Sequence, residues 1–244
     1  MRPTIDAWQW TEDEVELAFP AGGARSVRPA EPIVLAARAA MNPVDVEPHA
    51  IRLDRDSNGM LLTPEEFDRV EDFDDLFTYE LIKGVVIVNP IPSEAECGPN
   101  ELLGYFLLAY KESHPGGEAL DATLPERYVR TEDSRRRADR VIWAGLGRRP
   151  DPDTDVPTIA VEFVSRRRRD RRRDYDEKRR EYLALGVREY WVFDRFRRTL
   201  TVFRPGDAPA VVAEDGSYRT DLLPGFELTV SRIQECADRW ADRD

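Results

Sequence analysis

The order of hydrophobic and polar positions predicts regular structure clearly from Leu61 onward, and before it only short helical pieces, such as residues 11–17 and 32–40. Residues 100–113 repeat apolar side chains at intervals of three and four, which is typical of an amphipathic helix. Residues 77–90 contain two short runs rich in aromatic and aliphatic residues on either side of Lys83 and Gly84, which predicts a β-hairpin. Further strands are predicted at residues 119–129, 138–144, 158–165, 188–194 and 199–204, with a last turn or strand near 222–230.

Two more helices have recognisable ends. Thr63 is followed by Pro64 and two glutamates, and an N-cap, a first-turn proline and first-turn acids in this order predict a short helix. Residues 170–185 have the strongest helical pattern in the chain, and Gly186 ends it. Helices interspersed with strands predict an α/β or α+β fold, with a sheet that carries helices on its faces.

The first 57 residues differ from the rest of the chain. They are rich in alanine, proline and glycine and show no sustained period of 3.6 or 2. We therefore expect a loosely packed or partly disordered N-terminal extension over 1–57, a folded domain over 58–236 and a C-terminal tail over 237–244. No chemistry is predicted in the extension.

Composition narrows the class of protein. The 244 residues are 41% hydrophobic and 34% charged, which suits one sizeable core beneath a strongly solvated surface. Because no run of about 20 apolar residues occurs, we expect no membrane span. Cys97 and Cys236 lie far apart without metal-type spacing, which predicts reduced thiols and a cytoplasmic location.

The net charge of −12 does not exclude a nucleic-acid partner. Arginines cluster at residues 135–137, 148–149 and 166–173, whereas acids cluster at 12–16 and 65–75. A binding partner experiences the local electrostatic field and not the net charge of the whole chain. The net charge therefore neither supports nor excludes binding to nucleic acid.

Glu162 is the first candidate for chemistry, because it lies inside the apolar run TIAVEFVS. A carboxylate in a strand that is buried on both faces is unfavourable unless it is paired, protonated or bound to a cation. A structural ion pair with one of the many arginines is one interpretation. A metal ligand is the interpretation that the context favours.

Asp139 and Lys178 complete a predicted constellation. Asp139 opens the strand at 138–144 and, taken alone, would be an ordinary strand-end aspartate. Lys178 falls on the helical stripe of Tyr175 and Tyr182, so it is predicted to face the sheet, unless its ammonium extends back to water. Two carboxylates on adjacent strands would bind Mg²⁺ or Mn²⁺, and the lysine would orient or polarise the attacking water.

Several segments carry a resemblance to a known family: TPEEFDRV, YELIKGVVIVNP, ADRVIWAG, TIAVEFVS, DEKRREYLALGVREYWVFD and LLPGFEL. Over residues 61–233 the chain resembles the Uma family of restriction-endonuclease-like proteins, in the PD-(D/E)xK nuclease superfamily. The resemblance implies a mixed central sheet flanked by helices. It also implies a site formed by an Asp, a Glu and a helix-borne Lys, here Asp139, Glu162 and Lys178, with Glu80 as an auxiliary acid.

Two departures from the family pattern concern the site directly. Ala138 stands where a proline would precede the aspartate, and Val164 stands where a lysine normally follows the glutamate by two positions. The second departure makes the predicted site depend on Lys178.

These observations predict a metal-dependent endonuclease that hydrolyses DNA phosphodiester bonds. Arg166, Arg167 and Arg171 could contact phosphates, and the alternative for them is a solvated, ion-paired helix start. A homodimer would allow both strands to be cut. The alternative function is a binding or regulatory module without turnover, in which the same fold meets nucleic acid or an acidic protein.

Overall fold

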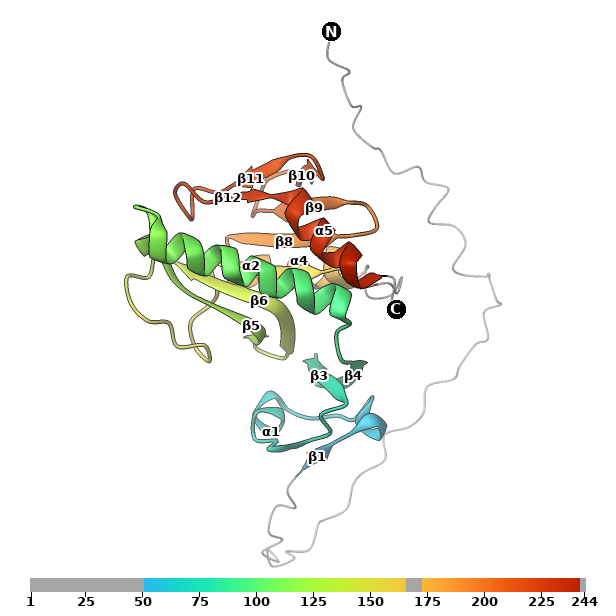
Figure 1. Ribbon diagram of the computed structural model, residues 1–244. Helices are drawn as coiled ribbons and strands as arrows, with labels where there is room; N and C mark the ends of the chain where they lie inside the picture. Colours follow the sequence, from blue (N-terminus) through green and yellow to red (C-terminus); the bar gives the residue numbers. More distant parts are fainter. Residues whose placement is uncertain (1–50, 166–172, 242–244) are drawn as a thin grey trace, which may run out of the picture. The chain divides into compact units, whose positions relative to one another are not determined.

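The computed structural model describes residues 51–165 and 173–241, which belong to one compact unit, Pro48–Asp244. Its centre is a mixed sheet with helices on both faces, which is the predicted fold class (Figure 1). In chain order, the strands of this sheet are β3 (Phe77–Ile82), β4 (Val85–Pro90), β5 (Leu120–Arg130), β6 (Arg135–Ala144), β7 (Ile159–Phe163), β8 (Glu189–Asp194), β9 (Thr199–Phe203) and β10 (Ala210–Ala213).

Short strands and helices complete the chain. Two small sheets pair β1 (Arg52–Leu53) with β2 (Asp72–Phe73) and β11 (Ser217–Arg219) with β12 (Glu227–Thr229). The helices are α1 (Pro64–Asp68), α2 (Glu94–Ser113), α4 (Arg179–Leu185) and α5 (Val230–Ala241), with the helical turns η2 (Arg55–Ser57), η3 (Gly117–Ala119) and η4 (Arg173–Lys178).

The order of strands across the sheet is β10-β9-β8-β7-β6-β3-β4, and β5 pairs with β6. Only the pair β7–β8 is parallel among the pairings of this sheet that the structure describes. A parallel pair needs a crossover connection, and η4 and α4 lie within the connection from β7 to β8. The helix that bears Lys178 is therefore part of a crossover that returns along one face of the sheet.

Two hydrophobic clusters fill the space between the sheet and the helices. One lies beneath α2 and α5 and contains Leu103 and Ile233 together with Trp191 of the sheet. The other lies beneath α4 and contains Tyr182 together with Trp143. A third cluster joins α1 to β3 and β4. The sheet is thus covered on both faces, as expected for strands with long apolar runs.

The predicted hairpin and the predicted helix starts are present. Lys83 and Gly84 both have positive φ angles, 50° and 78°, which is the backbone of a two-residue turn between antiparallel strands. The Thr63 hydroxyl accepts from the Glu66 amide at 3.2 Å, and the Glu66 carboxylate accepts from the Thr63 amide at 2.8 Å. This reciprocal pair caps the N-terminus of α1.

Several elements differ from the sequence prediction, and strands β10 and β11, for example, had no predicted counterpart. Helix α2 begins at Glu94 and includes Pro99, whereas the apolar pattern predicted its start near 100. Strand β6 begins at Arg135, three residues before the predicted strand. Helix α5 was not predicted, although four of its five buried residues, Val230, Ile233, Gln234 and Ala237, have helical spacing, with Cys236 as the fifth.

Only part of the predicted division into extension, domain and tail can be compared with the described residues. Residues 1–50 of the expected extension lie outside them, whereas β1 and η2 occupy positions within 51–57. At the other end, α5 continues to Ala241.

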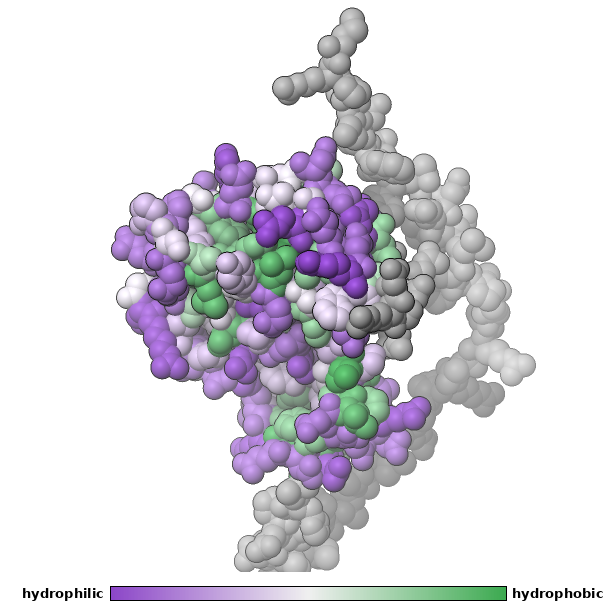
Figure 2. Space-filling model, in the orientation of Figure 1, coloured by the Kyte–Doolittle hydropathy of each residue, from purple (hydrophilic) through white to green (hydrophobic). Residues whose placement is uncertain are grey.

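The surface in Figure 2 is largely hydrophilic, with hydrophobic atoms over α2 and near β3 and β4. Exposed large hydrophobic residues in these places include Leu108 on α2 and Leu76 and Ile91 beside the hairpin. Scattered apolar residues of this kind are usual on a folded domain. None of the described helices is long and apolar enough to cross a membrane.

Candidate active site

Strand β6 has an interrupted edge, and the predicted site residues lie along it. On one edge, β6 pairs with β5 from Arg135 to Ala144. On the other edge, it pairs with β7 at Arg140–Ile142 and with β3 at Arg135. Between these two pairings, residues 136–139 have neither β3 nor β7 as a partner in the described sheet. We call this stretch the fork. Its backbone groups need other partners, and side chains supply them.

Glu80, on β3, is one of those partners. Its side chain is buried, and its Oε1 accepts a hydrogen bond from the backbone amide of Arg137 at 2.9 Å. Asn89, on the neighbouring strand β4, donates to the other oxygen, Oε2, at 3.4 Å. The Glu80 carboxylate therefore links β3 to β6 at a point where these two strands no longer pair directly.

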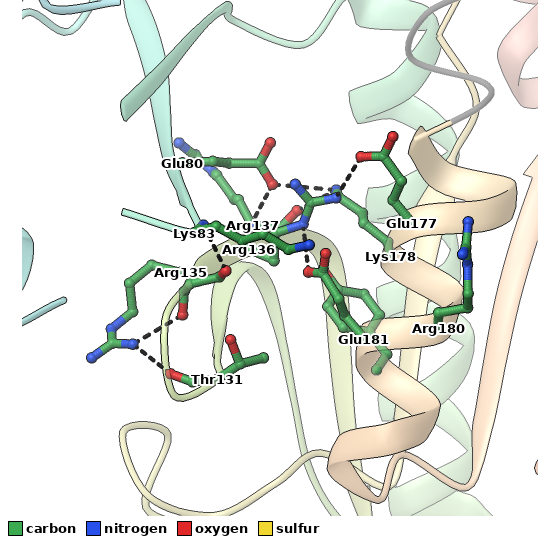
Figure 3. Close-up of polar contacts among 12 residues, drawn as sticks. Glu80, Lys83, Thr131, Arg135, Arg136, Arg137, Glu177, Lys178, Arg180 and Glu181 are labelled. Atoms are coloured by element: carbon green, nitrogen blue, oxygen red, sulfur yellow. Dashed lines mark hydrogen bonds and ion pairs between the residues drawn. The ribbon is translucent and has the colours of Figure 1, made fainter. Parts of the chain in front are cut away.

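Lys178 enters the fork from the crossover helix. Its side chain is only 3% exposed, and Nζ donates to the Arg137 carbonyl at 2.6 Å and to Glu162 Oε2 at 2.8 Å. The same ammonium lies 3.6 Å from Glu80 Oε1 (Figure 3). The ammonium thus points inward between two carboxylates. The structure does not show the alternative conformation in which it reaches back to water.

Glu162 lies near the carboxyl end of β7, with its side chain 4% exposed. In addition to the ammonium of Lys178, the hydroxyl of Tyr182 lies 3.4 Å from its Oε1. Both partners come from the same crossover helix, one turn apart. Among the residues that the structure describes, the cation paired with this buried acid is therefore a lysine.

Asp139 is half-buried at the end of the fork. Its Oδ2 accepts from the backbone amide of Phe163 at 2.6 Å, and its carbonyl accepts from Asn100 on α2 at 2.7 Å. The β5–β6 pairing skips Glu126 and Asp139, and Glu126 has a φ of 52°. The register is the same on both sides of this gap, but the left-handed backbone of Glu126 makes the pairing irregular, and the side chains of β6 change direction here.

That change of direction alters the predicted neighbours of Asp139. Simple alternation would place it on the face of Val141 and Trp143 and would place Ala138 on the other face. Ala138 instead packs in the same cluster as Val141 and Trp143, beneath α4. Alternation therefore breaks between Ala138 and Val141, and Asp139 lies at the break.

One cavity of about 100 Å³ is lined by all four residues predicted to form the site, Asp139, Glu162, Lys178 and Glu80. Glu96 and Glu126 also line it, so five carboxylates face two cations, Lys178 and Arg137. The excess of acid favours positively charged ligands. The structure brings the predicted residues together, whereas their chemical roles stay a prediction.

Arg137 is the cation of this cavity that sequence reasoning did not select. Its Nε donates to Glu126 Oε2 at 2.7 Å, and its side chain is 29% exposed. Burial raises the pKa of the Glu126 carboxyl, and the neighbouring guanidinium opposes that rise. The predicted phosphate contacts, Arg166, Arg167 and Arg171, lie outside the described residues.

The donor set suits a hard divalent cation. Carboxylate oxygens are the ligands that Mg²⁺ prefers, and this ion usually takes only one or two carboxylates because it keeps several waters. Asp139 and Glu162 supply that number within one acidic cavity. Within residues 51–165 and 173–241, no group of three or more His, Cys, Asp or Glu side chains is arranged to hold a metal ion. The fit therefore rests on the chemistry of two carboxylates.

The fold and this constellation define a nuclease-like protein of the restriction-endonuclease-like class. The family model Uma2, described as "Putative restriction endonuclease", matches residues 64–231. The chain belongs to this family, and the resemblance found in its sequence is confirmed.

A solved structure supports the fold. It is described as a "putative nuclease belonging to DUF820", from Anabaena variabilis ATCC 29413. The similarity covers 72% of this chain and 99% of that one, with 14% sequence identity and a TM-score of 0.60. No curated protein matches this chain.

One further sequence signal points to the site. The chain contains three lysines, Lys83, Lys111 and Lys178, beside 33 arginines. Arginine fills nearly every basic position, so a lysine on an inward helical stripe stands out. A compact ammonium fits between two carboxylates, whereas a planar guanidinium has a larger and differently shaped set of donors.

Proposed function

We propose that this protein is a divalent-metal-dependent endonuclease that hydrolyses DNA phosphodiester bonds. The observation that carries the proposal is the convergence of Asp139, Glu162 and Lys178 on one acidic cavity. Family membership and the similarity of fold support a nuclease-like role. The metal requirement and the DNA substrate are the parts that we propose.

Asp139 and Glu162 would hold the divalent ion, with Mg²⁺ or Mn²⁺ as the candidates. A bound ion supplies positive charge at the phosphate oxygens and makes water a better nucleophile near neutral pH. Asp139 is already oriented for this purpose, because the amide of Phe163 holds one of its oxygens.

Lys178 and Arg137 would bind the negatively charged phosphate of the substrate. In the structure, Lys178 divides its ammonium between Glu162 and Glu80. A cation held by those carboxylates would weaken their hold on the ammonium and leave it as a donor toward a phosphate oxygen. Arg137, at the partly exposed side of the cavity, is suited to contact a phosphate.

A cleavage assay tests the proposal. Supercoiled and linear DNA are incubated with the protein and Mg²⁺ or Mn²⁺, and Asp139→Ala is compared with the exposed control Asp207→Ala. We expect Asp139→Ala to lower the cleavage rate about 100-fold or more, since loss of a single charge-stabilising group has effects of that size. Asp207→Ala should cut at the wild-type rate.

Lysine substitutions provide a second matched pair. Lys178→Met should abolish most cleavage, whereas Lys83→Met, in the exposed hairpin turn, should retain it. Absence of metal-dependent cutting by the wild type on every DNA substrate would remove the enzymatic proposal.

A second candidate function is a binding or regulatory module without turnover. The observation that favours it is the position of Lys178, whose ammonium already neutralises Glu162 in a buried ion pair. Calorimetric titration with Mn²⁺ separates the two functions. If no ion binds and Glu162→Gln leaves the protein equally or more stable, the binding module is the better description.

A further inference from the structure

Arg136 is a fully buried cation on β6, one residue before the carbonyl that receives Lys178. Its side chain is 0% exposed, Nε lies 3.1 Å from Glu181 Oε2, and Nη2 lies 3.9 Å from Glu177 Oε2. None of its three side-chain nitrogens forms a hydrogen bond of good geometry within the described residues. Burial of a guanidinium without full hydrogen bonding is unfavourable, so its retention needs a physical reason.

The partners of Arg136 flank Lys178 on the helix. Glu177 immediately precedes the lysine, and Glu181 follows it by three positions, one helical turn from Glu177 (Figure 3). Arg136 and the carbonyl of Arg137 are neighbours along β6. Two adjacent residues of one strand therefore contact the same turn of the helix, through an ion-pair network and through the Lys178 hydrogen bond.

The backbone at Lys178 makes its position sensitive to this contact. The turn η4, which ends at Lys178, is π-helical, and the α-helical turn begins at Arg179. Such a turn is uncommon and changes the register of every side chain that follows it. Among the contacts that the structure describes, the Lys178 ammonium donates at 2.6 Å to the Arg137 carbonyl and at 2.8 Å to Glu162. A small slide of the helix along β6 would remove both contacts.

We propose that Arg136 is a positioning residue, whose ion pairs with Glu177 and Glu181 fix the helical turn that holds Lys178 between Glu162 and Glu80. The proposal rests on the proposed function only where it treats Lys178 as part of the active site. Burial raises the pKa of the Glu181 carboxyl, so Arg136 also offsets part of the penalty on that acid.

Arg135 provides a matched control from the same strand. It is also largely buried, but its guanidinium bonds to Asp68, at 2.7 Å, and to the carbonyls of Thr131 and Ser134. These partners lie on α1 and in the β5–β6 turn, and none lies on the crossover helix. Substitution of an arginine that only stabilises this end of β6 should, like substitution of Arg135, leave the position of Lys178 unchanged.

The three lysines of the chain allow a direct test that does not depend on activity. Full-length protein is acylated with a water-soluble amine reagent, and mass spectrometry follows Lys83, Lys111 and Lys178 separately. Selective ¹³C,¹⁵N labelling of lysine gives the corresponding side-chain amine signals by NMR. Exposed Lys83 serves as the internal reference.

Wild-type Lys178 should be strongly protected from acylation, because the amine must leave the site to react. Arg136→Gln should raise its acylation rate about tenfold relative to Lys83, which is the scale expected when a supporting contact is lost. Glu181→Gln should act in the same direction, with Lys111 as the reference because Lys83 interacts electrostatically with Glu181. Arg136→Lys should restore part of the protection. Arg135→Gln should leave Lys178 unchanged, even if it lowers thermal stability.

The proposal is overturned if Arg136→Gln and Glu181→Gln fold normally and keep Lys178 as protected as in the wild type. If Arg136→Gln does not fold, Glu181→Gln decides by the same criterion. Failure of wild-type protein to cut DNA would count against the proposed function alone, because the labelling measures the position of an amine and not turnover.

Discussion

An ammonium shared by two buried glutamates is the central feature of the site at the scale of single residues. Lys178 lies 2.8 Å from Glu162 and 3.6 Å from Glu80, so the cavity carries its own cation. A buried ion pair is weak support for stability, because desolvation offsets much of the attraction. Under the proposed function, the arrangement keeps these carboxylates available to a competing positive charge.

Cys97, on α2, can report the charge state of this cavity. Loss of solvation, followed by the carboxylates of Glu126 and Asp139, raises the pKa of its thiol to about 11. Alkylation by iodoacetamide at pH 8 should therefore be slow and should accelerate as the pH rises toward 11, since the thiolate is the reactive form. Mass spectrometry of the alkylated Cys97 peptide measures the rate.

Divalent ions should change that rate in a defined direction. Positive charge beside Asp139 lowers the thiol pKa, so Mg²⁺ should accelerate alkylation about two- to threefold at pH 8. Asp139→Ala should remove the dependence on Mg²⁺. An acceleration of equal size in Asp139→Ala would place the ion elsewhere.

Sequence reasoning found residues whose burial conflicts with their charge. Glu162 and Lys178 were selected because an acid in an apolar run and a lysine on an inward stripe both need partners, and each is the partner of the other. Arg136 and Glu126 were not found. Their contacts depend on where β6 stops pairing with β3 and β7 and on where its side chains change direction. The local sequence pattern does not indicate either feature.

At the scale of elements, the long helix α2 holds Asp139 through its backbone. Asn100 on this helix donates to the Asp139 carbonyl and accepts from buried Arg140, at 2.7 Å in each case. One turn further, Gly104 leaves room for the guanidinium of Arg140, since a Cβ there would lie 2.6 Å from Nη2. The absence of a side chain at 104 allows helix and strand to approach closely.

Gly104→Ala should therefore lower the free energy of unfolding by about 1–3 kcal/mol, because the added methyl group displaces a tethered side chain in a packed interior. Urea unfolding followed by circular dichroism measures the change. The adjacent outward-facing substitution Tyr105→Ala should change stability by less than about 0.5 kcal/mol. Equal stability of Gly104→Ala and wild type would mean that Arg140 can move at no cost.

The helices and strands were predicted best where the spacing of apolar residues and the residue types at the ends of the element indicate the same structure. The hairpin of β3 and β4 has both, because alternating apolar residues surround a turn with positive φ at Lys83 and Gly84. Helix α5 has helical spacing, but it follows β12 directly, and charged residues interrupt its apolar positions. The first residues of β6 are arginines, and pairing with β5 makes them a strand despite their polarity.

At the scale of the whole molecule, the proposed function would require a single site to act on both strands of a duplex. The described residues of each chain bring the predicted site residues together in one cavity. Cutting both strands would therefore require two chains, or one chain that binds each strand in turn. We expect a homodimer on duplex DNA. Supercoiled plasmid should then give linear product at an initial rate that rises with about the square of protein concentration below the dimerisation constant.

Mixing experiments make this expectation sharper. Asp139→Ala chains added to wild-type chains should convert linear product to nicked product, because mixed dimers carry one active site. Linear product that is proportional to protein concentration, and unaffected by inactive chains, would instead indicate a monomer that visits each strand in turn.

Four anchors of the site are main-chain atoms of the fork and of Phe163. The amide and carbonyl of Arg137, the amide of Phe163 and the carbonyl of Asp139 hold Glu80, Lys178, Asp139 and α2. Such anchors survive any substitution that leaves the strand intact. Position 137 can therefore drift during evolution and change what the cavity recognises, while the groups around it keep their places.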